Sequence, residues 1–231
     1  MFEENFTGVK NKFYNNGQLK SEVFLCNGKK EGEYKEFYEN GQLKEQSLYV
    51  DGKLEGEYKS FHENGQLLEH CFYVNDKLEG EYKEFHKDGK ILVEINHKNG
   101  KQDGLTKKYD TKGYGLIKSE TNFKNGKKNG IHRSYYVDYY DYNGIQLYEE
   151  STYKDNKYNG ILKIYTTDGI LHKEVTYING IQNGIYRVYY NNGQIKEEVN
   201  YNNDMKNGIC KLYDNNGNLK EVNYRDGVII S

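Results

Sequence analysis

Glycine recurs in this chain with a period of 24 residues, and this spacing constrains the fold more than any other feature. The first glycines of the repeats are Gly8, Gly32, Gly56, Gly80 and Gly104. Two longer steps lead to Gly130 and Gly160, and the spacing of 24 then resumes at Gly184 and Gly208. Self-similarity at a fixed period is typical of repeat proteins. We therefore expect a lead-in, residues 1–7, followed by one repeat domain, residues 8–231. The nine repeats are residues 8–31, 32–55, 56–79, 80–103, 104–129, 130–159, 160–183, 184–207 and 208–231.

Each repeat contains two tight-turn signals. In the second repeat, Asn40-Gly41 and Asp51-Gly52 separate segments with alternating polar and apolar residues. Such dipeptides favour type I′ hairpin turns, which need positive φ at both central residues. We expect strands over residues 33–38 and 43–50 of this repeat. The equivalent turn glycines are Gly17, Gly41, Gly65, Gly89, Gly144, Gly169, Gly193 and Gly217.

No helical periodicity competes with this pattern. The predicted fold is all-β: an elongated, single-layer antiparallel β-meander of nine hairpin repeats with about eighteen short strands. Strands about 4.8 Å apart would extend over about 85 Å. Because sheets twist, we expect a curved half-pipe or ribbon.

Alternation along the strands predicts two different faces. Pairing outward from Asn40-Gly41 places Tyr38 opposite Leu43. One face then carries Tyr34, Tyr38, Leu43 and Tyr49, and the other carries Lys35, Phe37, Lys44, Gln46 and Leu48.

The first face is most apolar in the eighth repeat, where it includes Tyr186, Tyr190 and Tyr201. Two interpretations stay open for these tyrosines. They form a self-contained ladder, or they form an aromatic patch covered by a protein partner, a dimer mate or a peptide. On the second interpretation, Tyr186, Tyr190 and Tyr201 are candidate partner-binding residues.

The sixth repeat is six residues longer than the 24-residue unit, whereas the fifth is longer by two, and the insertion of the sixth is rich in tyrosine. Tyr135 and Tyr136 fall on regular columns of the repeat, whereas residues 137–141 and Ile145 are extra. We expect a hairpin that extends past its neighbours and presents three further candidate contact residues, because tyrosine is enriched at interface hot spots. These are Tyr139, Tyr140 and Tyr142. An even number of added residues keeps the two faces in phase.

The two halves of the chain differ in polarity, although the net charge is only −2. Repeats two to four begin Glu-Gly-Glu, whereas later repeats carry leucine or isoleucine after the glycine. One hypothesis is a solvated N-terminal half and a partner-contacting C-terminal half.

The sequence contains no constellation that indicates catalysis. His62 and His86 occupy one column, but equivalent positions lie about 9.6 Å apart, which is too far for one metal ion. Cys26, Cys71 and Cys210 have no CxxC partner. There is no phosphate-binding loop and no basic stripe for nucleic acid. We expect no cofactor, no metal and no enzymatic activity.

The sequence also bears on location. It shows no signal peptide and no apolar run that could span a bilayer. Three scattered cysteines are typical of reduced thiols, so we expect a cytoplasmic protein.

Four segments carry a resemblance to a known family: GEYKEFYENGQLKE (32–45), GEYKSFHENGQLLE (56–69), GEYKEFHKDGKILVE (80–94) and GIYRVYYNNGQIKEE (184–198). They resemble the MORN repeat, in the variant found in bacterial and viral chains of the YwqK antitoxin-like type. The chain departs from the pattern in having tyrosine where tryptophan often follows the first glycine. The resemblance implies an elongated single sheet, and it implies little about activity.

Three functions are consistent with these observations. The first is a non-enzymatic scaffold that binds a protein partner, with a homodimer also open. The second, implied by the resemblance, is an antitoxin or immunity protein that neutralises a toxin by binding it. The third is weak peripheral association with phospholipid through lysines in the turns, such as Lys29, Lys30, Lys127 and Lys128.

Overall fold

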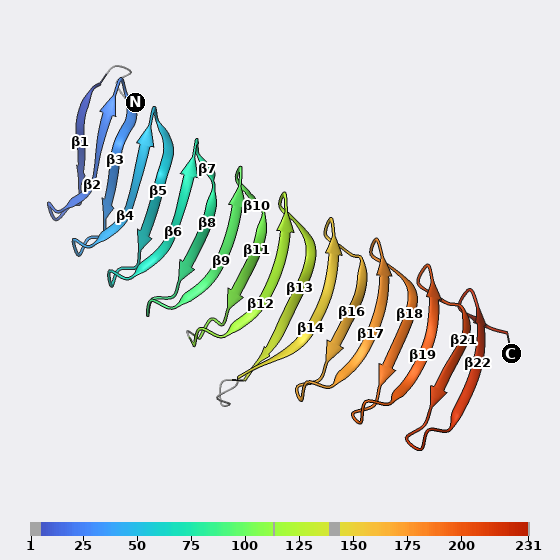
Figure 1. Cartoon of the computed structure of the whole chain (residues 1–231). Coiled ribbons are helices and arrows are strands. Elements are labelled where there is room, and N and C mark those ends of the chain that lie inside the picture. The colour runs from blue at the N-terminus through green and yellow to red at the C-terminus, as the bar shows by residue number, and fades with distance from the viewer. Residues whose placement is uncertain (1–5, 113, 139–143, 231) are drawn as a thin grey trace. The chain divides into compact units, whose positions relative to one another are not determined.

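A computed structural model describes residues 6–112, 114–138 and 144–230, and all regular structure in them is β-strand. The chain divides into two compact units, Met1–Gly115 and Leu116–Ser231, here the N-terminal and C-terminal units. In each unit the strands form a single antiparallel layer, and neither a helix nor a second sheet covers it (Figure 1). The predicted all-β fold of hairpin repeats is confirmed.

The strands follow one another in chain order as hairpins. Those of the N-terminal unit are β1 (Gly8–Phe13), β2 (Leu19–Cys26), β3 (Lys29–Phe37), β4 (Leu43–Val50), β5 (Lys53–Phe61), β6 (Leu67–Val74), β7 (Lys77–Leu78), β8 (Gly80–Phe85), β9 (Ile91–Lys98), β10 (Lys101–Gln102) and β11 (Gly104–Tyr109). Those of the C-terminal unit are β12 (Ile117–Lys124), β13 (Lys127–Val137), β14 (Ile145–Lys154), β15 (Lys157–Tyr158), β16 (Gly160–Tyr165), β17 (Leu171–Ile178), β18 (Ile181–Tyr189), β19 (Ile195–Asn202), β20 (Met205–Lys206), β21 (Gly208–Tyr213), β22 (Leu219–Arg225) and β23 (Val228–Ile229).

A bulge at the first glycine of each repeat explains the two-residue strands. Between β4 and β5, Ser47 pairs with Tyr58 and Tyr49 pairs with Leu54, so Leu48 faces three residues centred on Gly56. Gly56 has a φ of 84°, where a β-carbon would be strained and would lie 3.5 Å from Leu48. In other repeats the same bulge divides the strand, so that the two residues before the bulge form a short strand of their own, as β7 does before β8.

The two turns of a repeat differ in type. Asp51 and Gly52 have φ values of 50° and 83°, as a type I′ turn requires. At the other end only Gly41 has positive φ, and Tyr38 N–H donates to Gln42 O. This is a three-residue loop, in which a type I turn is followed by a left-handed glycine. The prediction of type I′ turns is therefore right at Asp51-Gly52 and wrong at Asn40-Gly41.

The turn type also shifts the register near the hairpin end. Glu36 pairs with Glu45 as the outward count predicts, but Leu43 pairs with Phe37, not with Tyr38. Lys44 is the extra residue of a bulge, and its Nζ lies 2.9 Å from Glu36 Oε1. The predicted faces of Leu43 and Lys44 were wrong for this reason.

Two faces result, and we name them by the residues of the second repeat. Face A carries Tyr34, Glu36, Glu45, Ser47 and Tyr49, and face B carries Glu33, Lys35, Phe37, Gln46 and Leu48. Equivalent residues of the other repeats lie on the same faces.

The ninth repeat shows how a one-residue change is accommodated. Its two strands pair without a bulge, with Cys210 opposite Val222 and Lys211 opposite Glu221. The preceding repeat has the bulge, with Tyr186 opposite Val199. A residue has been lost at the bulge, so the faces stay in phase although the length changed by an odd number.

The insertion of the sixth repeat lengthens its hairpin. Val137 pairs with Ile145, and Asp138 N–H donates to Gly144 O at 2.7 Å. Both contacts lie beyond Tyr136, which occupies the position of Tyr38 in the second repeat. The hairpin therefore extends past the usual turn, as predicted, and residues 139–143 lie outside the described residues.

Seven of the buried side chains form one column on face A, at the position of Ser47. Its buried members, none more than 8% exposed, are Val23, Ser47 and Cys71 in the N-terminal unit and Thr121, Ser151, Val175 and Val199 in the C-terminal unit. Tyr34 pairs directly with Ser47, and the Tyr34 and Tyr49 rings meet edge-on at 6.1 Å. With no second layer, these aromatic side chains cover the small ones.

Candidate protein-binding surface

The tyrosines of face A are bonded within the chain. The Tyr34 hydroxyl donates to Glu36 at 3.1 Å, and the Tyr82 hydroxyl donates to Glu69 at 2.9 Å. Burial, reinforced by these carboxylates, raises the pKa of both tyrosines above its usual value. Within the described repeats, face A therefore resembles the self-contained ladder that the sequence left open.

Three tyrosines predicted to bind a partner also make internal contacts. The rings of Tyr186 and Tyr201 lie 5.6 Å apart, and burial raises the pKa of both. The Tyr190 hydroxyl donates to Tyr213 O in the next repeat at 2.7 Å. Their role in partner binding stays a prediction. The other three candidates lie outside the described residues: Tyr139, Tyr140 and Tyr142.

Carboxylates on face A are compensated locally. Glu36 and Glu45 stand directly opposite each other. Burial raises the pKa of Glu45, although Ser47 donates a hydrogen bond to it at 3.2 Å. Burial is the largest influence on Glu36 and would raise its pKa, but the hydrogen bond and charge of Lys44, the Tyr34 hydroxyl and the charge of Lys20 together outweigh it, so that pKa is lowered.

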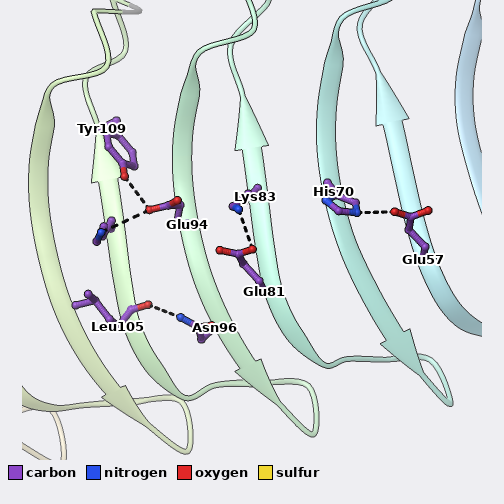
Figure 2. Close-up of polar contacts among 9 residues, drawn as sticks. Glu57, His70, Glu81, Lys83, Glu94, Asn96, Leu105 and Tyr109 are labelled. Atoms are coloured by element: carbon purple, nitrogen blue, oxygen red, sulfur yellow. Dashed lines mark hydrogen bonds and ion pairs between the residues drawn. The ribbon is translucent and has the colours of Figure 1, made fainter.

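Face B of the N-terminal unit carries short polar contacts (Figure 2). Glu57 lies 2.8 Å from both Lys59 Nζ and His70 Nε2. The same position in the next repeat is Glu81, which lies 2.8 Å from Lys83 Nζ. These contacts are partly exposed to solvent; the two lysine pairs run along a strand, and the contact of His70 with Glu57 joins β6 to β5.

The row of polar contacts changes composition towards β11. Glu94 accepts a hydrogen bond from the Tyr109 hydroxyl at 2.7 Å, and Lys107 Nζ lies 3.9 Å from it. The Asn96 amide donates to Leu105 O at 3.1 Å (Figure 2). Leucine has replaced the glutamate that follows the first glycine in earlier repeats.

An exposed apolar row accompanies these charges. Phe24, Leu48 and Phe72 are 40%, 41% and 43% exposed, although they are large apolar side chains. Leu48 pairs with Glu33, and Phe72 pairs with Glu57. Sequence alternation predicted Leu48 on this face, but it did not predict that Leu48 belongs to an exposed apolar row.

The C-terminal unit places its exposed apolar row on the neighbouring strand. Ile161 pairs with Thr176, and Ile185 pairs with Asn200. The row consists of Ile131, Ile161, Ile185 and Ile209, which are 43%, 49%, 40% and 52% exposed. The apolar residue and its polar partner have exchanged strands relative to the N-terminal unit, so both units expose an apolar row on face B.

Charged pairs lie beside the isoleucine row. Arg187 Nε lies 2.7 Å from Glu198, and the Tyr189 hydroxyl donates to Glu174 at 2.7 Å. In the sixth repeat, Arg133 makes the equivalent contact with Glu150 at 2.8 Å. Face B of this unit therefore combines apolar side chains with neutralised charges.

The described residues hold no cluster of side chains suited to metal binding. No three His, Cys, Asp or Glu side chains in this part of the chain converge on a metal position. His62 Nε2 lies 3.0 Å from Phe85 O, which gives it a structural role. Burial raises the pKa of the Cys71 thiol to about 11, which leaves it unreactive at neutral pH. Among the residues described, no helix is long and apolar enough to cross a membrane.

Comparison with known families follows the same repeat boundaries. The model of the MORN repeat variant matches seven segments, which together cover more than half of the chain: 6–27, 30–51, 54–75, 78–99, 158–179, 182–203 and 206–226. The chain belongs to the MORN repeat variant family. MORN repeats are in general repeats for protein or membrane interaction. The matched segments omit residues 100–157, where the fifth and sixth repeats are longer than 24 residues.

Other comparisons are less informative. No curated protein sequence matches the chain significantly. Two solved structures have low similarity: a TcdB2-TccC3-Cdc42 crystal structure (14% identity, TM-score 0.19) and virginiamycin B lyase from Staphylococcus aureus (13% identity, TM-score 0.17). The alignments cover 93% and 94% of this MORN chain, but 14% and 70% of those chains. At such TM-scores they carry no argument about fold or function.

Proposed function

We propose that this MORN protein is a non-enzymatic scaffold that binds a protein partner on face B. The observation that supports this proposal is the pair of exposed apolar rows, one in each unit. Soluble monomers rarely expose contiguous large apolar side chains unless a partner covers them. The tyrosines of face A are less suited to this role, because several of their hydroxyl groups, such as those of Tyr34 and Tyr82, already bond within the chain.

Affinity purification followed by mass spectrometry tests the scaffold proposal. The full chain, expressed in its source cell, should retain a defined protein partner. A variant with Leu48→Ser and Ile185→Ser should retain less of it, because one residue is lost from each apolar row. Equal recovery with both chains, or no specific protein with either, would contradict the proposal.

The identity of the partner separates the finer alternatives. A single toxic protein whose activity is lost in the complex would indicate an antitoxin. Co-sedimentation with anionic liposomes that weakens as salt is added would indicate lipid association instead. We propose the cytoplasm as the compartment, because the three cysteines of the chain are free thiols.

A further inference from the structure

Three shallow depressions follow one another on face B of the N-terminal unit, with volumes of 340, 260 and 680 Å³. Each combines a large apolar side chain with carboxylates. Phe24 lines the first, Leu48 the second and Phe72 the third. Glu33 and Glu57 both line the depression at Leu48, so the apolar residue has a carboxylate on either side.

The glycine bulge produces this combination. Gly56, in its left-handed conformation, is flanked in sequence by Glu55 and Glu57, opposite the strand that carries Leu48. Glu55 accepts the Asn75 N–H at 2.8 Å and lines the depression at Phe72 together with Glu79, whereas Glu57 lines the depression at Leu48 together with Glu33. The Glu-Gly-Glu sequences of neighbouring repeats therefore place two carboxylates at each of these two depressions.

These carboxylates exceed the nearby lysines. Each Glu-Gly-Glu bulge has one lysine partner on its strand, such as Lys59 for Glu57 or Lys83 for Glu81. The glutamate before the glycine, such as Glu55, instead accepts a backbone N–H. More carboxylates than lysines therefore line the depressions: Glu22, Glu31 and Glu33 with Lys35 in the first, and Glu33 and Glu57 with Lys59 in the second. The row is therefore both apolar and negatively charged.

We propose that this row of the N-terminal unit binds a basic polypeptide segment whose apolar side chains are spaced about 10 Å apart. The proposal rests on the scaffold function and specifies the partner class. Equivalent depressions are two strands apart, about 9.6 Å. In the polyproline II conformation a chain has three residues per turn and rises about 3.1 Å per residue, so every third side chain lies on one face about 9 Å from the previous one and successive apolar residues reach successive depressions. Lysine or arginine between them meets the surplus carboxylates.

The C-terminal unit lacks this chemistry. Isoleucines such as Ile161 and Ile185 replace the second glutamate of the bulge, and their strand partners are Thr176 and Asn200. The unit therefore presents an apolar row without the flanking carboxylates. It serves as the internal control for the proposal.

Fluorescence anisotropy with synthetic peptides tests the inference on the full chain. The probe is a peptide of repeated Leu-Lys-Ser triplets, and the charge control is the Leu-Glu-Ser peptide. The lysine peptide should bind, and added salt should weaken it. A lysine peptide of the same composition with its leucines paired side by side should bind less tightly, because it breaks the spacing.

Matched variants locate the site. Glu33→Gln with Glu57→Gln, which removes both carboxylates that line the depression at Leu48, should weaken binding of the lysine peptide by about fivefold, as expected for two exposed ion pairs. Glu39→Gln with Glu63→Gln removes the same charge at the opposite turns and should leave binding unchanged. Leu48→Ser with Phe72→Ser should weaken binding by about tenfold. Ile161→Ser with Ile185→Ser, of similar exposure, should leave it unchanged.

Several results would overturn the inference. Equal weakening by either control pair would show non-specific attraction or a site elsewhere. Co-sedimentation of the protein itself with phosphatidylserine vesicles, lost in the Leu48→Ser and Phe72→Ser variant, would assign the row to a membrane. A cellular partner that ignores the glutamate and the Leu48 and Phe72 variants but is lost with Ile161→Ser and Ile185→Ser would refute this site while the scaffold function on face B stands. Recovery of no protein partner would refute the scaffold function itself. Circular dichroism confirms that each variant is folded.

Discussion

Replacement of Val199 by alanine tests whether the small-residue column of face A is the core. Val199 is 1% exposed and stands opposite Tyr186. The change removes two buried methyl groups, at about 0.8 kcal/mol each. Incomplete collapse of the site adds a cavity cost, so we expect a total loss of about 2 to 3 kcal/mol.

Urea unfolding, followed by circular dichroism, measures this loss. Val228→Ala is the matched control, because Val228 is 65% exposed. It should change the free energy of unfolding by less than about 0.5 kcal/mol. The slope of unfolding against urea should stay the same in both variants, since the exposed area changes little. If Val199→Ala costs no more than Val228→Ala, the column is not the core and the assignment of the faces is wrong.

Three further predictions address the insertion, the acidic pair and the corner hydrogen bond. Replacing Tyr139, Tyr140 and Tyr142 of the sixth repeat with serine should weaken partner recovery severalfold and leave the circular dichroism spectrum intact. Unchanged recovery would show that the insertion is not part of the interface. Glu45→Gln should raise the melting temperature by about 3 °C at pH 7. Burial raises the pKa of Glu45 in the folded state above its value in the unfolded state. The stability that the protonated Glu45 carboxyl contributes is therefore fully present below the unfolded-state pKa and is lost as pH rises through the folded-state pKa. The gain should therefore disappear near pH 4, and a gain of equal size at both pH values would contradict the sign. Tyr190→Phe leaves a backbone carbonyl without its partner and should cost about 1 kcal/mol in urea unfolding, whereas no loss would show that water replaces the hydroxyl.

Much of the fold could be read from glycine spacing. A left-handed turn residue is a local requirement of the backbone, so Asp51-Gly52 predicts its own turn without reference to distant residues. The turn type predicted at Asn40-Gly41 was wrong because Asn-Gly occurs both in two-residue and in three-residue hairpin loops. The longer loop moved Leu43 opposite Phe37 and turned Lys44 towards Glu36.

The candidate surface was less predictable. The composition indicated tyrosine as the contact residue. The exposed fraction of a tyrosine, however, depends on the residues that its ring and hydroxyl contact in neighbouring repeats. The Tyr190 hydroxyl reaches Tyr213, 23 residues away, and local alternation cannot predict that contact. Leu48 lies on face B as predicted, but its exposure depends on the bulge opposite it, and that bulge appears only when β4 and β5 pair.

The sequence by itself determined the repeat, the all-β class and the type I′ turns, because each depends on periodicity or on the backbone freedom of a few residues. Membership of the MORN repeat variant family follows from the same local pattern. The tertiary structure decided which face is satisfied and which is exposed. Burial and hydrogen bonding are properties of pairs of strands, so they arise only when the register brings Tyr34 to Ser47 and Leu48 to the Gly56 bulge.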